Sequence, residues 1–187
     1  MRKAVASLFL SLDGVMEAPE NWHFPYFNDE MGAAIGEAMS SADAFLLGRR
    51  TYQEWAEYWP AQSADQNPVA EVINGLPKYV VSTTLNEVSW QNSTLLGADV
   101  ASEVSKLKQQ PGKDLSISGS ATLVRSLIDE GLLDELRLMI HPVVLGSGRR
   151  LFEDGAAQAP LELIASQTFS TGVLNLTYRP AADRKET

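Results

Sequence analysis

Three short segments of the chain combine glycine, hydroxyl and arginine residues in a way that suits phosphate binding. They are Gly48-Arg49-Arg50-Thr51, Ser82-Thr83-Thr84 and Ile117-Ser118-Gly119-Ser120-Ala121-Thr122. The N-terminus of a helix offers free backbone N–H groups and a positive dipole end, and arginine adds a bidentate grip on phosphate. Together the segments predict a site for a dinucleotide with an extra ribose phosphate, so NADPH suits them better than NADH.

Each segment taken alone also has an ordinary explanation. The first is compatible with a helix start whose arginines are solvated, and the second with a turn and a helix cap. The third is not the G-x-G-x-x-G fingerprint of dinucleotide-binding folds. The stronger signal is their joint occurrence, each after a strand-like run, because ligands in open α/β sheets bind beyond the carboxyl ends of the strands.

Strand-like and helix-like segments alternate along the chain, which predicts an α/β sheet covered by helices. The eight expected strands are 3–11, 44–47, 79–82, 94–96, 115–118, 134–141, 161–168 and 173–179. Several are near-continuous apolar runs, as in strands that are buried on both faces. The last two are separated by only a few residues and predict an antiparallel hairpin at one edge.

Apolar residues at helical spacing predict helices between these strands. One set is Met31, Ile35, Met39 and Ala42. Residues 100–107 contain a second set. The clearest helix is 122–131, where four apolar residues form one stripe and Gly131 stands where a C-terminal cap uses glycine.

The composition describes an acidic chain of 187 residues with a net charge of −9 and no cysteine. We expect residues 1–180 to form a single domain and residues 181–187 a polar tail. The acidic balance argues against nucleic-acid binding, which neutralises phosphates with Lys and Arg. No apolar run approaches the roughly 18 residues that span a bilayer, so no membrane contact is expected. The lack of cysteine fits a cytoplasmic location.

The irregular stretch 20–29 is rich in aromatic residues, which is unusual for a solvated loop. It makes Trp22 and Phe27, with the following Glu30, candidate substrate contacts. A hydride transfer also needs a proton source near the acceptor atom, and Asp29 is the best placed carboxyl group. The alternative is that Asn28 caps a helix whose first turn holds the two acidic residues.

Asp13 directly follows the first strand and faces the expected cleft. It either takes part in catalysis by contacting substrate hydroxyls or simply makes a turn. Arg149 and Arg150 follow a glycine-containing turn and either recognise a substrate phosphate or are solvated. His23 is a candidate substrate contact, whereas His141 is expected to be a strand-end residue. Two histidines far apart in a chain without cysteine predict no metal site.

Four motifs together resemble the dihydrofolate reductase superfamily. They are Ser11-Leu12-Asp13-Gly14-Val15, Gly48-Arg49-Arg50-Thr51-Tyr52, Gly131-Leu132-Leu133-Asp134-Glu135-Leu136, and His141-Pro142-Val143-Val144-Leu145-Gly146-Ser147-Gly148 with Leu151-Phe152 after it. The last two are similar to the C-terminal hallmark of the reductase domain in the bifunctional riboflavin-biosynthesis deaminase-reductase. The resemblance spans residues 2–180.

The resemblance implies a three-layer αβα fold of the dihydrofolate reductase type. Its sheet would have eight strands, mostly parallel, with the antiparallel hairpin at the C-terminal edge. By the same resemblance, the first phosphate segment would contact cofactor phosphates, and Ser82 and Thr83 would lie near the adenosine ribose phosphate. Residues 118–122 would lie under the pyrophosphate and beside the nicotinamide. The backbone around Phe9 and Leu10 would face the carboxamide.

The function that the resemblance implies is NADPH-dependent reduction of a small nitrogen heterocycle, most like the 5-amino-6-(5-phosphoribosylamino)uracil reductase of riboflavin biosynthesis. A homodimer is expected by resemblance. Two alternatives stay open: a dihydrofolate or pteridine reductase, and a nucleotide-binding relative without turnover. In Trp22-His23-Phe24-Pro25 the chain is similar to dihydrofolate reductase, but Asp29 comes later after the proline than the substrate acid does there. Ser118 also stands where the family usually has a glycine.

Overall fold

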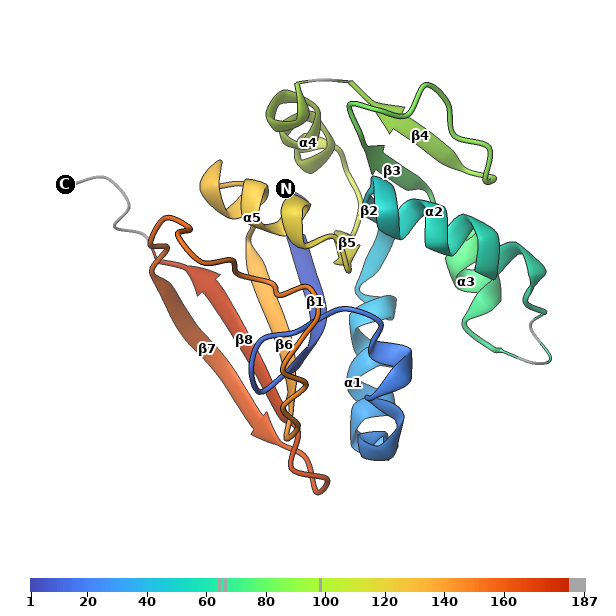
Figure 1. Cartoon of the computed structure of the whole chain (residues 1–187). Helices are drawn as coiled ribbons and strands as arrows, with labels where there is room; N and C mark the ends of the chain where they lie inside the picture. Colours follow the sequence, from blue (N-terminus) through green and yellow to red (C-terminus); the bar gives the residue numbers. More distant parts are fainter. Residues whose placement is uncertain (64, 66, 98, 182–187) are drawn as a thin grey trace.

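The computed structural model describes residues 1–63, 65, 67–97 and 99–181, so residues 182–187 of the expected tail lie outside the described part. One eight-stranded sheet runs through it in the order β4-β3-β2-β5-β1-β6-β8-β7 (Figure 1). The strands are β1 (Ala4–Ser11), β2 (Ala42–Gly48), β3 (Lys78–Val81), β4 (Ser93–Leu96), β5 (Asp114–Ser118), β6 (Glu135–His141), β7 (Leu161–Thr168) and β8 (Leu174–Pro180). The eight expected strands are confirmed, with small shifts at their ends.

The first six strands in the chain pair in parallel, and β8 is antiparallel both to β6 and to β7. The expected mostly parallel sheet with an antiparallel C-terminal hairpin is therefore confirmed. Parallel neighbours need a crossover connection, and the helices supply most of these. Because the parallel strands point the same way, β1, β2, β3 and β5 all end at the same edge of the sheet.

Helices cover both faces of the sheet and make three layers (Figure 1). They are α1 (Asp29–Ser40), α2 (Arg49–Tyr58), α3 (Ala70–Gly75), α4 (Val100–Gln109) and α5 (Ala121–Asp129), with 3₁₀ turns at Pro19–Asn21, Phe24–Tyr26 and Trp59–Ala61. α4 and α5 share one apolar core with β1 and β5. α2 and α3 pack with Phe45 and Leu47 of β2, and α1 packs near Met139 of β6. None of the helices in the described residues is long and apolar enough to cross a membrane.

The local signals for helix ends are confirmed at α5 and α1. The apolar stripe of α5 is buried, and its chain turns at Gly131, where φ is +66° and glycine is free of the Cβ clash. Leu132 then donates its N–H to the carbonyl of Leu127 at 2.8 Å, which satisfies a free carbonyl of the last turn. At α1, the Oδ1 of Asn28 accepts the N–H of Met31 at 3.0 Å, as an N-cap does.

One residue of the predicted helical sets lies elsewhere. Met31, Ile35 and Met39 belong to α1, but the helix ends at Ser40, and Ala42 is the first residue of β2. Ala42 pairs there with Asp114 of β5. A small apolar residue at helical spacing is equally compatible with a buried strand, and the sheet contact decides between them.

Candidate functional site

The turns that follow β2 and β5 are joined by a short chain of hydrogen bonds. The N–H of Gly48 donates to the Oγ of Ser120 at 2.9 Å. The same hydroxyl lies 2.9 Å from the Oγ1 of Thr51 and donates to it. Since β2 and β5 are neighbours in the sheet, the first and third predicted phosphate segments form one site at the carboxyl edge. We call the residues Gly48, Arg49, Arg50, Thr51, Gly119 and Ser120 the β2–β5 junction.

The β2–β5 junction leaves no room for side chains at its glycines. Gly119 has a φ of +64°, and a Cβ added there would lie 2.8 Å from the Oγ1 of Thr51. A Cβ on Gly48 would lie 3.0 Å from the Oγ of Ser120. Ser120 itself has a φ of 59°, an uncommon conformation for a residue other than glycine. The glycines therefore let the two turns pack closely together at the starts of α2 and α5. Backbone N–H groups at a helix start are the groups that commonly bind a pyrophosphate.

Arg49 and Arg50 are the first two residues of α2, and both are exposed. Within the described part of the chain neither forms an ion pair. Two cations at a helix N-terminus are unfavourable, because that end of the dipole is already positive. A bound anion would relieve this repulsion, so the pair is better explained by a ligand phosphate than by helix stability.

Some of the other residues in the third segment are buried in the core, and others are accessible to a ligand. Ile117 and Ala121 are buried in the core, so only their backbone is available to a ligand. Ser118, the last residue of β5, is half-buried. Thr122 is exposed, and its Oγ1 accepts a hydrogen bond from Arg125 at 3.4 Å. In this segment, only the backbone and the hydroxyl groups are therefore available for the predicted cofactor contacts.

The second segment follows β3 and contains a hydroxyl-capped turn. The Oγ of Ser82 accepts the N–H groups of Thr84 at 3.1 Å and Leu85 at 3.0 Å. This is the capping role that the residue types alone also suggested. Thr83 is exposed and free of such contacts in the described residues. The predicted contact of Ser82 and Thr83 with an adenosine ribose phosphate stays a prediction.

Asp13 holds a distant loop in place. Its carboxylate accepts hydrogen bonds from the hydroxyl of Ser11 at 2.7 Å and from the N–H groups of Leu145 at 3.1 Å and Gly146 at 2.9 Å. These hydrogen bonds, first that of Ser11, lower the pKa of Asp13 to about 2. The group is thus ionised at neutral pH and has no proton to donate. Its catalytic role stays a prediction, and its observed contacts are structural.

The two acidic residues at the start of α1 lie in different settings. Asp29 is exposed as the first residue of the helix. Glu30 accepts from the hydroxyl of Ser170 at 2.6 Å and from its N–H at 2.7 Å, which lowers the pKa of Glu30. Glu30 therefore ties α1 to the turn between β7 and β8. Protonation of a substrate is best served by a carboxyl group in a dry pocket, and neither Asp29 nor Glu30 lies in one.

The predicted substrate contacts Trp22, Phe27 and Arg149 also differ in access. Trp22 is 9% exposed, and its Nε1 donates to the carbonyl of Glu17 at 2.9 Å. Arg149 forms an ion pair with the Glu17 carboxylate at 3.3 Å. Phe27 is 49% exposed and remains available to a ligand. Their roles as substrate contacts stay predictions.

Two histidines meet beside the end of β1. The rings of His23 and His141 have centroids 6.2 Å apart and are perpendicular. His23 stacks on Phe9 with centroids 4.9 Å apart, and the Nδ1 of His141 lies 3.2 Å from the carbonyl of Leu10. His141 is the last residue of β6, as expected for a strand-end residue. Sequence reasoning treated the two separately, because no local signal links positions so far apart.

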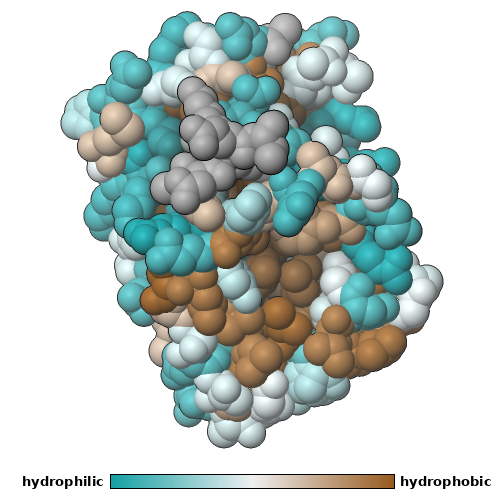
Figure 2. Space-filling view, turned by 90° about the vertical axis from the view of Figure 1, so that its left-hand side faces the viewer, coloured by the Kyte–Doolittle hydropathy of each residue, from teal (hydrophilic) through white to brown (hydrophobic). Residues whose placement is uncertain are grey.

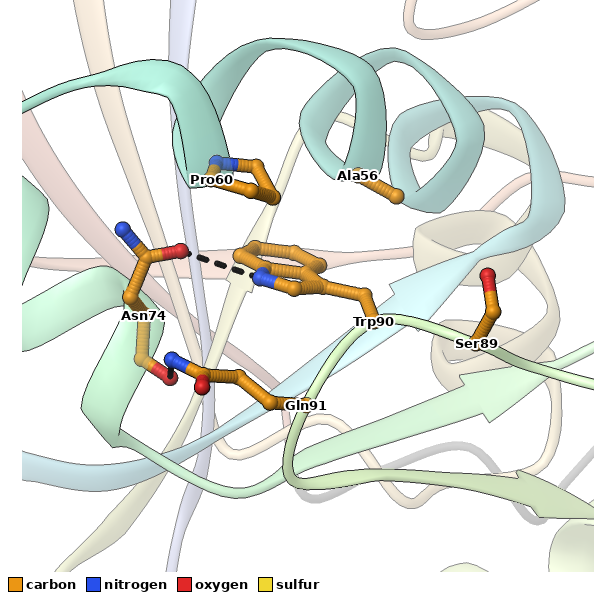
Figure 3. A pocket seen from close by; sticks show the side chains of 6 residues that line it. All are labelled: Ala56, Pro60, Asn74, Ser89, Trp90 and Gln91. Atoms are coloured by element: carbon orange, nitrogen blue, oxygen red, sulfur yellow. Dashed lines mark hydrogen bonds between the residues drawn. The ribbon is translucent and has the colours of Figure 1, made fainter.

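A polar pocket of about 360 Å³ lies away from this edge (Figure 3). Its walls are Ala56, Pro60, Asn74, Ser89, Trp90 and Gln91. Beneath it is Lys78, the first residue of β3, whose Nζ donates to the carbonyls of Asn74 at 2.7 Å and Gln91 at 3.2 Å. The pocket therefore lies toward the amino end of β3, where its polar groups bond to one another.

Comparison with known proteins gives the chain a consistent set of relatives. The family described as the RibD C-terminal domain matches residues 2–175. The uncharacterized protein YyaP of Bacillus subtilis is 33% identical over 95% of this chain and 94% of its own. A putative riboflavin biosynthesis protein from Shewanella has a TM-score of 0.77 at 19% identity, covering 96% of this chain and 99% of that one. Dihydrofolate reductase from Enterococcus faecalis, complexed with NADP(H), has a TM-score of 0.63 at 13% identity, covering 95% and 96%. The expected dihydrofolate reductase-like fold is confirmed.

Proposed function

Because the chain belongs to the RibD C-terminal domain family, we propose that it is an NADPH-dependent reductase of a small nitrogen heterocycle. The observation that carries the proposal is the β2–β5 junction. It combines two closely packed turns at helix starts with two exposed arginines that have no ion pair among the described residues. This donor set fits a dinucleotide that carries a further phosphate.

The residues of the junction would hold NADPH by complementary means. The two arginines would bind phosphate oxygens, and the backbone N–H groups at the start of α2 and α5 would receive the pyrophosphate. Gly119 and Ser120 would keep the turn open to it. When bound, NADPH supplies the hydride, and the protein positions the rings and provides a proton.

The proposed substrate class is a small heterocycle of the kind that the riboflavin-pathway reductases use, with 5-amino-6-(5-phosphoribosylamino)uracil as its first representative. The exposed rings of Phe24 and Phe27 support this, because they lie next to His23 and offer faces on which a planar ring can stack. A folate-type site with one buried acid is not favoured, since Asp29 is exposed.

The proposed assembly is a homodimer that uses the C-terminal hairpin. Figure 2 faces this side of the molecule and shows apolar side chains gathered on it. Leu163 and Ile164 of β7 are 50% and 44% exposed, and Leu174 of β8 is 38% exposed. An edge strand with exposed apolar side chains is a surface that proteins usually cover. Sedimentation velocity of the purified chain tests this, and a monomer at micromolar concentration would contradict it.

The first experiment titrates the protein with NADPH and with NADH, following the fluorescence of its four tryptophans. We expect tighter binding of NADPH, and a loss of about 10- to 100-fold in the Arg49→Ala/Arg50→Ala variant, which removes two charge-assisted contacts. The matched control is Lys106→Ala/Arg179→Ala, which loses the same charge at two exposed ion pairs on α4 and β8. Absence of binding by either dinucleotide would overturn the proposed function.

A further inference from the structure

Two buried imidazole rings beside the end of β1 are not used by the proposed cofactor site. His23 is 8% exposed and His141 is fully buried. The chain contains no other histidine. Each ring carries one buried nitrogen without a hydrogen-bond partner among the described residues: the Nδ1 of His23 and the Nε2 of His141. Buried polar atoms are nearly always paired in native proteins, so each of these two nitrogens needs a partner that the described residues do not supply.

The tautomer of His141 follows from its neighbours. Its Nδ1 lies 3.0 Å from the carbonyl of Met139 and 3.2 Å from the carbonyl of Leu10. Carbonyl oxygens only accept, so the Nδ1 carries the proton. Burial lowers the pKa of His141, which keeps the ring neutral. Its Nε2 is therefore a bare lone pair that needs a donor.

The imidazole ring of His23 packs between two aromatic side chains. It stacks on Phe9 with an interplanar angle of 22°, and the centroid of Phe24 lies 4.2 Å from its own. Burial lowers the pKa of His23; a positive charge on His141 would lower it further, and Glu20 raises it. Of the other ionisable groups packed here, Tyr26 lies against His141, with ring centroids 5.7 Å apart.

The position of the pair along the sheet edge links it to the proposed site. The strand order β2-β5-β1-β6 places the β2–β5 junction next to β1, and the pair lies at the ends of β1 and β6. Neighbouring strands are about 4.8 Å apart, so the pair lies roughly 10–15 Å from the junction. A dinucleotide whose phosphates occupy the junction and which extends along this edge would bring its reactive ring to the histidines.

We propose that His23 is the proton donor of the reductase and that His141 positions the substrate by accepting a hydrogen bond from its N–H or O–H group. The inference rests on the proposed function. The carbon of a C=N or C=O group accepts hydride from the reduced dinucleotide, and its π electrons move to the nitrogen or oxygen. That atom takes the proton that leaves the Nδ1 of His23 in its protonated form, which burial makes the minor form at neutral pH, and His23 is then reprotonated from water.

The first test follows the two imidazoles by ¹⁵N nuclear magnetic resonance, with His23→Gln and His141→Gln assigning the signals. In the free protein we expect His141 as the Nδ1–H tautomer. Saturating NADPH should shift the signals of His23. At an NADPH concentration near the Kd of the wild type, the Arg49→Ala/Arg50→Ala variant should show a much smaller shift. Bound NADPH that leaves both imidazoles unchanged would overturn the inference while leaving the proposed function intact. Failure of NADPH to bind would overturn both.

The second test uses 5-amino-6-(5-phosphoribosylamino)uracil as the probe in single-turnover reduction. His23→Gln should bind NADPH as the wild type does but react about 100-fold more slowly or worse, the usual contribution of a general acid. The wild-type rate should fall as pH rises through the lowered pKa of His23, and this fall should vanish in His23→Gln. In steady-state assays, His141→Gln should raise KM more than it lowers kcat. A His23→Gln enzyme that keeps the wild-type rate and pH profile would refute the proton-donor role.

Discussion

The two ends of the parallel strands differ in how some of their cations and buried nitrogens are paired. At the amino end, the cations are paired within the fold: Arg2 with Asp43, Lys3 with Glu135, and Lys108 with Asp134. Lys78, also there, bonds to two carbonyls and lies 4.1 Å from the centroid of the Trp90 ring. At the carboxyl end, Arg49 and Arg50 form no ion pair with described residues, and two histidine nitrogens are unpartnered.

This difference in pairing distinguishes polar groups that stabilise the fold from polar groups that are candidates for ligand binding. Polar groups that a fold needs are satisfied by the fold itself, because an unpaired buried group costs free energy. Buried atoms without a partner among the described residues occur at both edges, since the Oγ of Ser93 at the start of β4 is also one. At the carboxyl edge they are two imidazole nitrogens near a pair of exposed arginines, a set that a ligand would complete. The pocket over Trp90 is polar and accessible, yet its groups bond to one another, as Figure 3 shows for the indole of Trp90 and Asn74. Polar groups without partners therefore support the proposed site at the carboxyl edge, and the pocket over Trp90 does not compete with it.

The largest expected effect concerns Lys78 at the amino end. Burial lowers its pKa from 10.5 to about 8, so the unfolded chain binds more protons between these two values. Stability should therefore rise as pH increases from 8 to 10.5, by an amount on the order of 3 kcal/mol, and the cost of burial is complete below pH 8. Urea unfolding across this pH range measures it. The Lys78→Met variant should lack the rise, whereas Lys106→Met, at an exposed position, should keep it.

A smaller effect is expected from two glycines with nearly the same backbone. Gly119 and Gly131 have φ values of +64° and +66°, but only Gly119 has a neighbour that an added Cβ would meet. We expect Gly131→Ala to cost about 1 kcal/mol of unfolding free energy and Gly119→Ala about 2 kcal/mol, because Thr51 must also move. Only Gly119→Ala should weaken NADPH binding. Equal stability losses and equal affinities would remove the special status of the β2–β5 junction.

The smallest expected effect is an increase in stability rather than a loss. Removing Arg49 and Arg50 should stabilise the protein by about 0.5 kcal/mol in the absence of ligand, because two cations leave the positive end of α2 and alanine favours helix. The gain should shrink at high salt, where charge interactions are screened. Urea midpoints of Arg49→Ala/Arg50→Ala and of Arg49→Lys/Arg50→Lys, which keeps the charge, measure it. A loss of stability in the alanine variant would show that the arginines serve the fold.

Much of the architecture was predictable because its signals are local. The strands are apolar runs between turn residues, and the end of α5 needs only a buried stripe and a glycine at the cap. The β2–β5 junction was predicted in the same way, since each segment carries its glycine, hydroxyl or arginine next to a strand. Ala42 marks the limit of this reasoning, because its helical spacing was outweighed by pairing with β5.

The acidic candidates show why the substrate side was less predictable. Their residue types were suitable, but their partners lie far along the chain: Asp13 with Leu145 and Gly146, and Glu30 with Ser170. Each of these contacts occupies the carboxylate and lowers its pKa. A residue type indicates what a group is able to do, whereas its environment sets the protonation state in which it is found.

The amino-acid sequence by itself therefore determined the order of strands and helices, the family resemblance and which segments are proposed to bind phosphate. Those properties depend on neighbours a few residues apart. Only the tertiary structure decided that His23 meets His141, that Asp13 holds a loop, and that Arg49 and Arg50 form no ion pair with described residues. These are properties of burial and of contacts between distant segments, which arise only when β1 and β6 lie side by side in the folded sheet.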